Sequence, residues 1–199
     1  MKITYRGLIF ISLLFVYAVA VVGQESEFND AVKKISDHIQ LVDSVSGRFQ
    51  QDKTISVLPK PLKSSGEFSY SSVNGLEWNT QQPIPSRLIF DKDGIRQEMD
   101  GKILWQVEAE QPAVATITRV IVSVLALDWQ TLDDYFSISA NYDGGQWQID
   151  LVPKEQVLLQ LIASLTVTGN RQLEKMTLYE ANKDRTEIYF TFMDLGNNK

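Results

Sequence analysis

Short runs of alternating apolar and polar residues, separated by turn pairs, most restrict the fold of this chain. Outside residues 113–127, the alternation recurs from residue 48 to residue 192. Pairs such as Asn74-Gly75 and Asp93-Gly94 favour tight hairpins, because their backbones accept positive φ. Alternating runs joined by hairpins are typical of an antiparallel sheet and not of βαβ units. We therefore expect one large meandering sheet.

About ten strands satisfy this alternation. The alternating stretches from which they are expected are residues 48–55, 66–70, 76–80, 87–91, 95–99, 102–108, 135–142, 146–152, 165–168, 172–179 and 185–192. Residues 128–134 are expected as a short polar turn or helix, and residues 154–162 as one helical turn or a bulged loop. Since two main helices accompany these strands, the expected fold class is α+β.

Two stretches of the chain predict the main helices. The first follows Ser26, and its apolar residues recur in steps of four and three at Phe28, Val32, Ile35, Ile39 and Val42. The second covers residues 113–127, where Pro112 can occupy the first turn and nearly every side is apolar. A helix that is apolar all round lies either in the core or over a cavity whose occupant completes its burial. The sequence leaves both interpretations open.

Residues 1–23 are interpreted as a secretory signal peptide. Lys2 and Arg6 form a short basic region, and an almost unbroken apolar run over residues 8–22 follows. This run is shorter than the roughly 18 to 20 residues that a spanning helix needs. Cleavage after Gly23 is favoured, cleavage after Ala20 also fits, and retention as an N-terminal membrane anchor is the alternative. Residues 24–199 then form a single exported domain.

Composition excludes several kinds of function. The chain has no Cys and one His, which rules out a disulfide framework, a thiol nucleophile and a metal site built from several His residues. Its net charge is −6, with 19 Lys plus Arg against 25 Asp plus Glu, and it becomes −8 without Lys2 and Arg6. Such an acidic balance does not suit nucleic-acid binding. We expect neither a metal nor a cofactor.

Groups that could carry catalysis are few. His38 lies at the border of the apolar stripe of the first helix, where packing explains it. The acidic couples Asp133-Asp134 and Glu108 with Glu110 could act in glycoside hydrolysis only from a shared site, whereas adjacent acids on a strand point to opposite faces. Solvated surface explains both couples. The sequence therefore predicts no catalytic residue.

Apolar surface is the feature that remains. Four Trp, nine Phe and seven Tyr are spread mostly over the alternating strands. One large sheet has one face to bury, and the two helices are available to cover it. If the sheet curls around the helices, a cavity can form that suits acyl chains, which need exclusion from water more than directional hydrogen bonds. A filled core without a cavity is the alternative.

Several short motifs follow one another in a specific order along residues 28–192. They are Val45-Ser46-Gly47-Arg48-Phe49-Gln50-Gln51, Gly66-Glu67-Phe68-Ser69-Tyr70, Gly75-Leu76-Glu77-Trp78-Asn79-Thr80 with Pro83, Asp100-Gly101-Lys102-Ile103-Leu104-Trp105, Asp128-Trp129 and Leu151-Val152-Pro153-Lys154. This order resembles the LolA family of periplasmic carriers of outer-membrane lipoproteins. It is most similar to the LolA-like carriers associated with lipid exporters.

The resemblance implies a fold and a function. The fold is an incomplete β-barrel, a strongly curved antiparallel sheet with helices covering its concave apolar face. In the implied function, the cavity takes up the acyl chains of a lipid, glycolipid or lipoprotein cargo. The carrier receives this cargo from an inner-membrane exporter and passes it toward an outer-membrane acceptor, without catalysis. We expect a monomer in the periplasm of a Gram-negative bacterium. A binding module that senses lipids or lipoproteins and regulates a membrane partner is the alternative function.

The expected ligand-binding residues lie on the strands and on the second helix. They are Phe49, Phe68, Trp78, Leu88, Phe90 and Trp105 on strands, and Val120, Ile121, Val124 and Leu125 in the lid. One departure from the family pattern concerns the lid. In LolA proper, an Arg-Pro-Asn tripeptide supplies the Arg that tethers the lid. This chain has Ser-Ser-Val-Asn-Gly at the corresponding residues 71–75. This departure favours a lipid or glycolipid carrier over a strict lipoprotein carrier.

Overall fold

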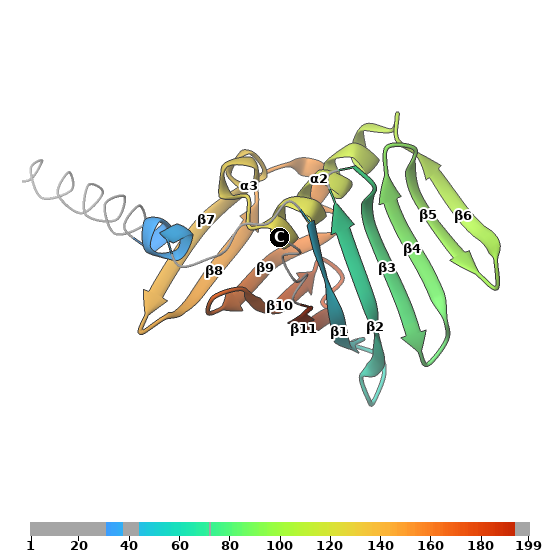
Figure 1. Ribbon diagram of the computed structural model, residues 1–199, viewed down its shortest axis with the longest axis horizontal. Helices are drawn as coiled ribbons and strands as arrows, with labels where there is room; N and C mark the ends of the chain where they lie inside the picture. Colours follow the sequence, from blue (N-terminus) through green and yellow to red (C-terminus); the bar gives the residue numbers. More distant parts are fainter. Residues whose placement is uncertain (1–30, 38–43, 72, 194–199) are drawn as a thin grey trace, which may run out of the picture.

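The computed structural model describes residues 31–37, 44–71 and 73–193. The first six strands are β1 (Ser44–Thr54), β2 (Leu62–Ser71), β3 (Gly75–Gln82), β4 (Ser86–Asp91), β5 (Gly94–Met99) and β6 (Lys102–Glu108). The remaining strands are β7 (Phe136–Asp143), β8 (Gln146–Pro153), β9 (Ile162–Gly169), β10 (Leu173–Glu180) and β11 (Arg185–Phe192). Within the described residues, these eleven strands form one sheet, in the order β6-β5-β4-β3-β2-β1-β11-β10-β9-β8-β7 (Figure 1).

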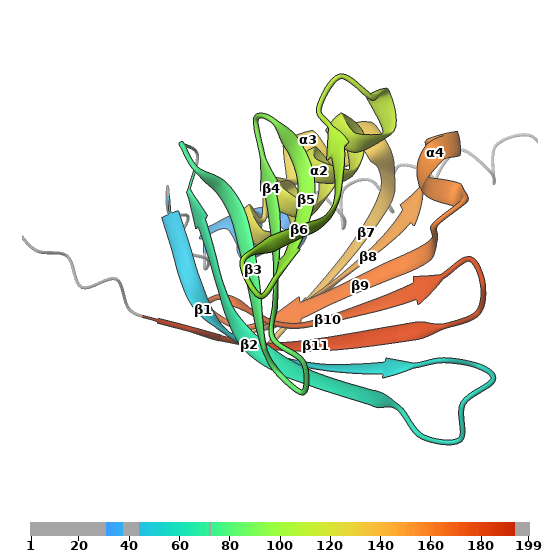
Figure 2. The same ribbon diagram turned by 90° about the vertical axis from the view of Figure 1, so that its right-hand side faces the viewer.

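Pairing of β1 with β11 makes one sheet out of two meanders. The antiparallel register runs from Gly47 opposite Phe192 to Thr54 opposite Arg185. Strands β6 and β7 are therefore the two edges of the sheet, and the sheet curves strongly without closing (Figure 2). The expected α+β class and the incomplete barrel are confirmed.

Two helices lie between the edges of the curved sheet. Helix α2 (Pro112–Ala126) follows β6 and packs against β5, whereas α3 (Trp129–Tyr135) precedes β7 and packs against it. Figure 2 shows both helices on the inner side of the sheet. The short helix α4 (Gln156–Leu159) joins β8 to β9. None of the helices in the described ranges is long and apolar enough to cross a membrane.

The junction between α2 and α3 is built by local backbone chemistry. Leu127 ends α2 in the left-handed conformation, with φ of 54°, and its backbone N–H donates to the carbonyl groups of Ser123 and Val124. Asp128 then caps the N-terminus of α3, because its side chain accepts a hydrogen bond from the Thr131 backbone N–H at 3.1 Å. The chain therefore turns sharply between the two helices.

Strand β1 begins at Ser44, four residues before its expected start. Gly47 lies inside this strand. A Cβ at Gly47 would lie 2.5 Å from the Thr191 carbonyl oxygen and 2.9 Å from a ring carbon of Phe68. Gly47 therefore marks a close approach of the neighbouring strands.

Part of the N-terminal expectations lies outside the described residues. This holds for the signal peptide over residues 1–23 and for His38. Of the first predicted helix, residues 31–37 are described and are helical, with Ala31 and Ile35 buried.

Candidate functional site

One face of the sheet carries an apolar surface that spans both meanders. Phe49 on β1 lies opposite Phe190 on β11, and Phe68 on β2 lies opposite Trp78 on β3. Cross-strand partners point to the same side of an antiparallel sheet. We call the side that carries Phe49 the concave face, because Phe49 belongs to the same buried cluster as the α2 residues Val120 and Val124 on the inner side of the sheet.

Aromatic side chains form the centre of this concave face. The rings of Phe49 and Trp78 are stacked with their centroids 4.0 Å apart. Phe68 stacks on Trp78 at 5.8 Å and meets Phe190 and Phe192 edge-on, each at 5.5 Å. Such stacked and edge-on arrangements stabilise the packing beyond the burial of area.

Helix α2 covers the concave face with one side. Val120, Val124 and Leu125 are buried in the core cluster, and Ile121 packs against it. The opposite side of the helix exposes Ala115 and Arg119. The helix is therefore less uniformly buried than its apolar sequence indicates.

Nine of the ten residues expected at the ligand-binding site contribute to one cluster. They are Phe49, Phe68, Trp78, Leu88, Phe90, Val120, Ile121, Val124 and Leu125. Trp105 on β6 is the exception, because it is 43% exposed. Its register opposite Gln97 places it on the same face, and its indole N–H donates to Gln97 Oε1 at 2.7 Å. Trp105 therefore lies at the open edge of the face, outside the packed centre.

Sequence reasoning missed the C-terminal half of the face. The core cluster includes Trp147, Ile149 and Leu151 on β8 and Phe190 on β11. Their alternation is visible in the sequence and could have indicated a buried face. Only the pairing of β1 with β11, however, joins this half to Phe49.

The concave face becomes polar at the end where β1 finishes. Lys53 Nζ lies 2.9 Å from Glu180 Oε1, and Thr186 Oγ1 donates to the same oxygen at 2.9 Å. Lys53 lies opposite Thr186 in the register, on the side of Phe49. The face therefore grades from aromatic rings to a charged pair along β1.

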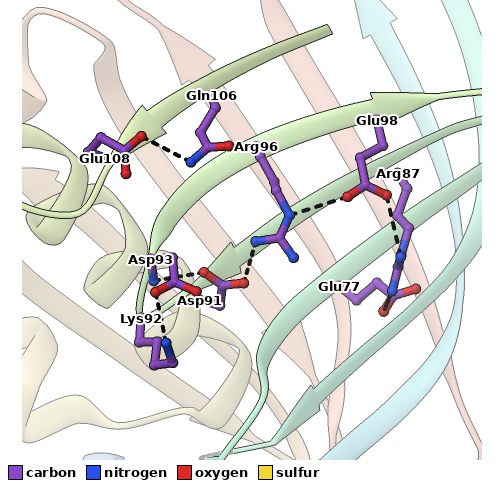
Figure 3. A network of polar contacts seen from close by, with 9 residues as sticks. All are labelled: Glu77, Arg87, Asp91, Lys92, Asp93, Arg96, Glu98, Gln106 and Glu108. Carbon is purple, nitrogen blue, oxygen red and sulfur yellow. Dashed lines mark hydrogen bonds and ion pairs between the residues drawn. The ribbon is translucent and has the colours of Figure 1, made fainter. Parts of the chain in front are cut away.

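The convex face of β3 to β5 carries a network of ion pairs (Figure 3). Arg87 bridges Glu77, at 2.6 Å, and Glu98, at 3.4 Å. Arg96 bridges Asp91, at 2.5 Å, and Glu98, at 3.2 Å. Beside the network lies a hollow of about 480 Å³, whose lining includes Ser and Arg side chains of β1 to β5. The network connects three neighbouring strands on the side opposite to the aromatic centre.

These contacts change the pKa values of the carboxyl groups involved. The hydrogen bond from Arg87 lowers the pKa of Glu77 below its ordinary value, and the charge of Arg87 adds to this effect. Burial acts to raise the pKa of Asp91, but hydrogen bonds from Arg96 and from the Asp93 backbone outweigh it, so this pKa is also lowered. Both carboxylates are therefore held in the charged form.

The acidic couples of the sequence lie on the surface. Asp133, Asp134, Glu108 and Glu110 are all exposed. Within the described part of the chain, His, Asp and Glu side chains form no group of three or more that could hold a metal ion. The site that the structure assembles is thus an apolar face under a helical cover, and its chemistry is the exclusion of water from apolar chains.

A curved, open antiparallel sheet with helices over an apolar concave face defines a half-barrel class of protein. The chain matches the family described as outer membrane lipoprotein carrier protein LolA over residues 40–197, and it belongs to this family. A relative, the outer-membrane lipoprotein carrier protein of Proteus mirabilis (strain HI4320), is 24% identical over 189 residues, which cover 90% of this chain and 85% of the relative. The family resemblance predicted from the sequence motifs is confirmed.

Solved structures with a similar chain trace include two distant proteins. A LolA superfamily protein from Nitrosomonas europaea aligns with a TM-score of 0.43 and 7% identity, over 86% of this chain and 96% of that chain. LprF from Mycobacterium bovis aligns with a TM-score of 0.37 and 10% identity, over 85% of this chain and 92% of that chain.

Proposed function

We propose that this protein is a periplasmic carrier that shelters acyl chains of a lipid, glycolipid or lipoprotein on its concave face. It receives the cargo from an inner-membrane exporter and passes it toward the outer membrane, as a monomer and without catalysis. Residues 1–23 direct export, and residues 24–199 form one carrier domain. The observation that carries the proposal is the continuous aromatic face under α2, in a chain of the LolA family.

Energy considerations support binding of one acyl chain. Burial of each CH₂ contributes about 0.8 kcal/mol. About ten buried methylene groups therefore correspond to about 8 kcal/mol, which is micromolar affinity. Affinity of this order is strong enough to hold the cargo and weak enough for an acceptor to remove it.

Entry of an acyl chain requires the helical cover to move, because the centre of the face is already packed. One feature of α2 favours such movement. Its most extensive contacts with the sheet are with β5, near one edge of the sheet.

A dansyl-labelled fatty acid tests the proposal in solution. We expect Ile121→Asp to weaken probe binding about tenfold or more, because the carboxylate would face the acyl chain without a partner. Ala115→Asp places the same charge on the exposed side of the same helix and should bind the probe like the wild type. Urea denaturation of both variants checks that each is folded.

Two results would overturn the proposal. One is a wild-type protein that binds neither the probe nor any lipid during purification. The other is equal probe affinity for Ile121→Asp and the wild type, which would place any binding away from the face under α2.

A further inference from the structure

Exposed apolar side chains gather at one end of the sheet. In the loop between β1 and β2, Val57 is 85% exposed and Leu58 is also exposed, as is Leu62 at the start of β2. Around α4, Leu159 and Leu161 are each 50% exposed. We call the surface formed by residues 55–63, 154–161 and 181–185 the loop rim. Exposed apolar side chains that gather in this way mark interaction sites.

Hydrogen bonds join the three segments of the loop rim. The Ser56 backbone N–H donates to Asp184 Oδ1 at 3.0 Å, which ties the β1–β2 loop to the β10–β11 turn. The Ala181 backbone N–H donates to the Leu161 carbonyl oxygen at 3.0 Å, which ties that turn to the segment after α4. Figure 2 shows α4, the β10–β11 turn and the β1–β2 loop on the same side of the molecule, at the right. The loop rim is therefore one connected surface.

The charge of the loop rim is opposite to that of the whole chain. The chain carries a net charge of −6, but the loop rim contains five basic residues and two acidic ones. The basic residues are Lys60, Lys63, Lys154, Lys183 and Arg185, and the acidic ones are Glu155 and Asp184. Asp184 is buried, where it accepts hydrogen bonds from Ser56 and Asn182.

Some of the basic side chains already have partners. Lys63 pairs with Asp52 at 2.6 Å, and Arg185 pairs with Glu187 at 3.1 Å. Within the described residues, Lys60 forms no ion pair, and it lies between the exposed side chains of Leu58 and Leu62 in the sequence. Apolar tips with interspersed basic residues are the features that bind anionic membrane surfaces.

We propose that the loop rim docks on the surface of an anionic lipid bilayer. Val57, Leu58 and Leu62 enter the headgroup region, and Lys60 meets lipid phosphates. This inference rests on the proposed carrier function, because the polar end of the concave face, with Lys53 and Glu180, opens at the same end of β1. Docking brings that end of the face to the bilayer from which cargo is loaded or on which it is released.

Co-sedimentation with vesicles tests the docking surface. The protein recovered from the periplasmic fraction is mixed with vesicles of phosphatidylglycerol and phosphatidylethanolamine, or of phosphatidylcholine alone. We expect binding to the anionic vesicles, weaker binding to the neutral ones, and a further loss as salt increases. Val57→Asp should reduce the partition coefficient about tenfold or more, because a charged group replaces an inserted apolar one.

Matched variants keep the test independent of folding and of the N-terminal segment. Val73 is 87% exposed and lies in the β2–β3 loop at the other end of the strands, so Val73→Asp should bind vesicles like the wild type. Lys60→Glu should weaken binding, whereas Lys92→Glu, in the β4–β5 turn, should not.

Three results would overturn the proposal that the loop rim docks on a bilayer. They are no binding of the wild type to anionic vesicles, equal losses for Val57→Asp and Val73→Asp, and a dimer in sedimentation equilibrium that Val57→Asp converts to a monomer. The last result would assign the loop rim to contact between copies of this chain.

The two proposals fail in different ways. Val57→Asp should retain affinity for the dansyl-labelled fatty acid, since Val57 lies outside the concave face. Conversely, Ile121→Asp should retain vesicle binding. A wild-type protein that binds anionic vesicles but not the fatty acid would contradict the carrier function and leave the loop rim as a membrane-binding surface.

Discussion

At the scale of single residues, Phe49 is the side chain on which the concave face is centred. It is 2% exposed and stacks on Trp78. Phe49→Ala should lower the free energy of unfolding by about 3 to 5 kcal/mol, because both apolar transfer and packing are lost. Urea denaturation measures the change. Val152→Ala, at a half-exposed position on β8, should change it by less than about 0.5 kcal/mol, and equal effects would contradict the assignment of the core.

The convex-face carboxylates give the protein a small dependence of stability on pH. Because the pKa of Glu77 is lower in the native than in the unfolded state, its contribution is fully present above its ordinary pKa of 4.5. The contribution is lost as the pH falls through the native pKa. The Glu77 side chain is 38% exposed, so screening limits the effect to less than about 1 kcal/mol.

Glu77→Gln provides the corresponding measurement. Between about pH 6 and pH 3, we expect the wild type to lose more stability in urea denaturation than Glu77→Gln does, because the variant no longer has this carboxyl to protonate. A steeper loss in Glu77→Gln would show that the sign is wrong.

At the scale of elements, the short helix α3 depends on its N-terminal cap. Asp128 is exposed, so its replacement leaves the core intact. Asp128→Ala should lower the free energy of unfolding by about 1 kcal/mol and increase hydrogen exchange at the Thr131 backbone N–H, which would lose its acceptor. Asp128→Asn retains a capping oxygen and should stay close to the wild type. Unchanged exchange in Asp128→Ala would mean that the cap does not hold α3.

Alternation and turn pairs were sufficient to predict most strands, because the period of two and the Gly-containing turns are local properties. The same alternation placed Phe68 and Trp78 on one face, and the register confirms this placement. Pairing between β1 and β11 could not be predicted, because it joins residues far apart in the chain. For that reason, the expected site covered only half of the concave face.

Helix α2 shows a second limit of sequence reasoning. Its apolar composition predicted a helix in the core or over a cavity, but composition does not reveal which side is exposed. The structure shows that Arg119 faces outward, where its guanidinium donates to the Tyr135 hydroxyl at 3.3 Å. This contact links α2 to α3. The helices therefore form a joined cover.

At the scale of the whole molecule, an open sheet presents two different surfaces. Its concave face is apolar and covered by α2 and α3, whereas its convex face on β3 to β5 is tied by ion pairs. The loop rim lies at one end of the same strands. On our account, the concave face holds acyl chains and the loop rim positions this face at a bilayer.

Photo-crosslinking from neighbouring residues of β3 tests the central claim most directly. Trp78 points to the concave face and Glu77 to the convex face, so a benzoylphenylalanine at each position samples opposite sides of one strand. With a radiolabelled fatty acid, we predict crosslinking from position 78 and none above background from position 77. Equal crosslinking from both positions, or crosslinking from position 77 alone, would contradict binding of acyl chains on the concave face.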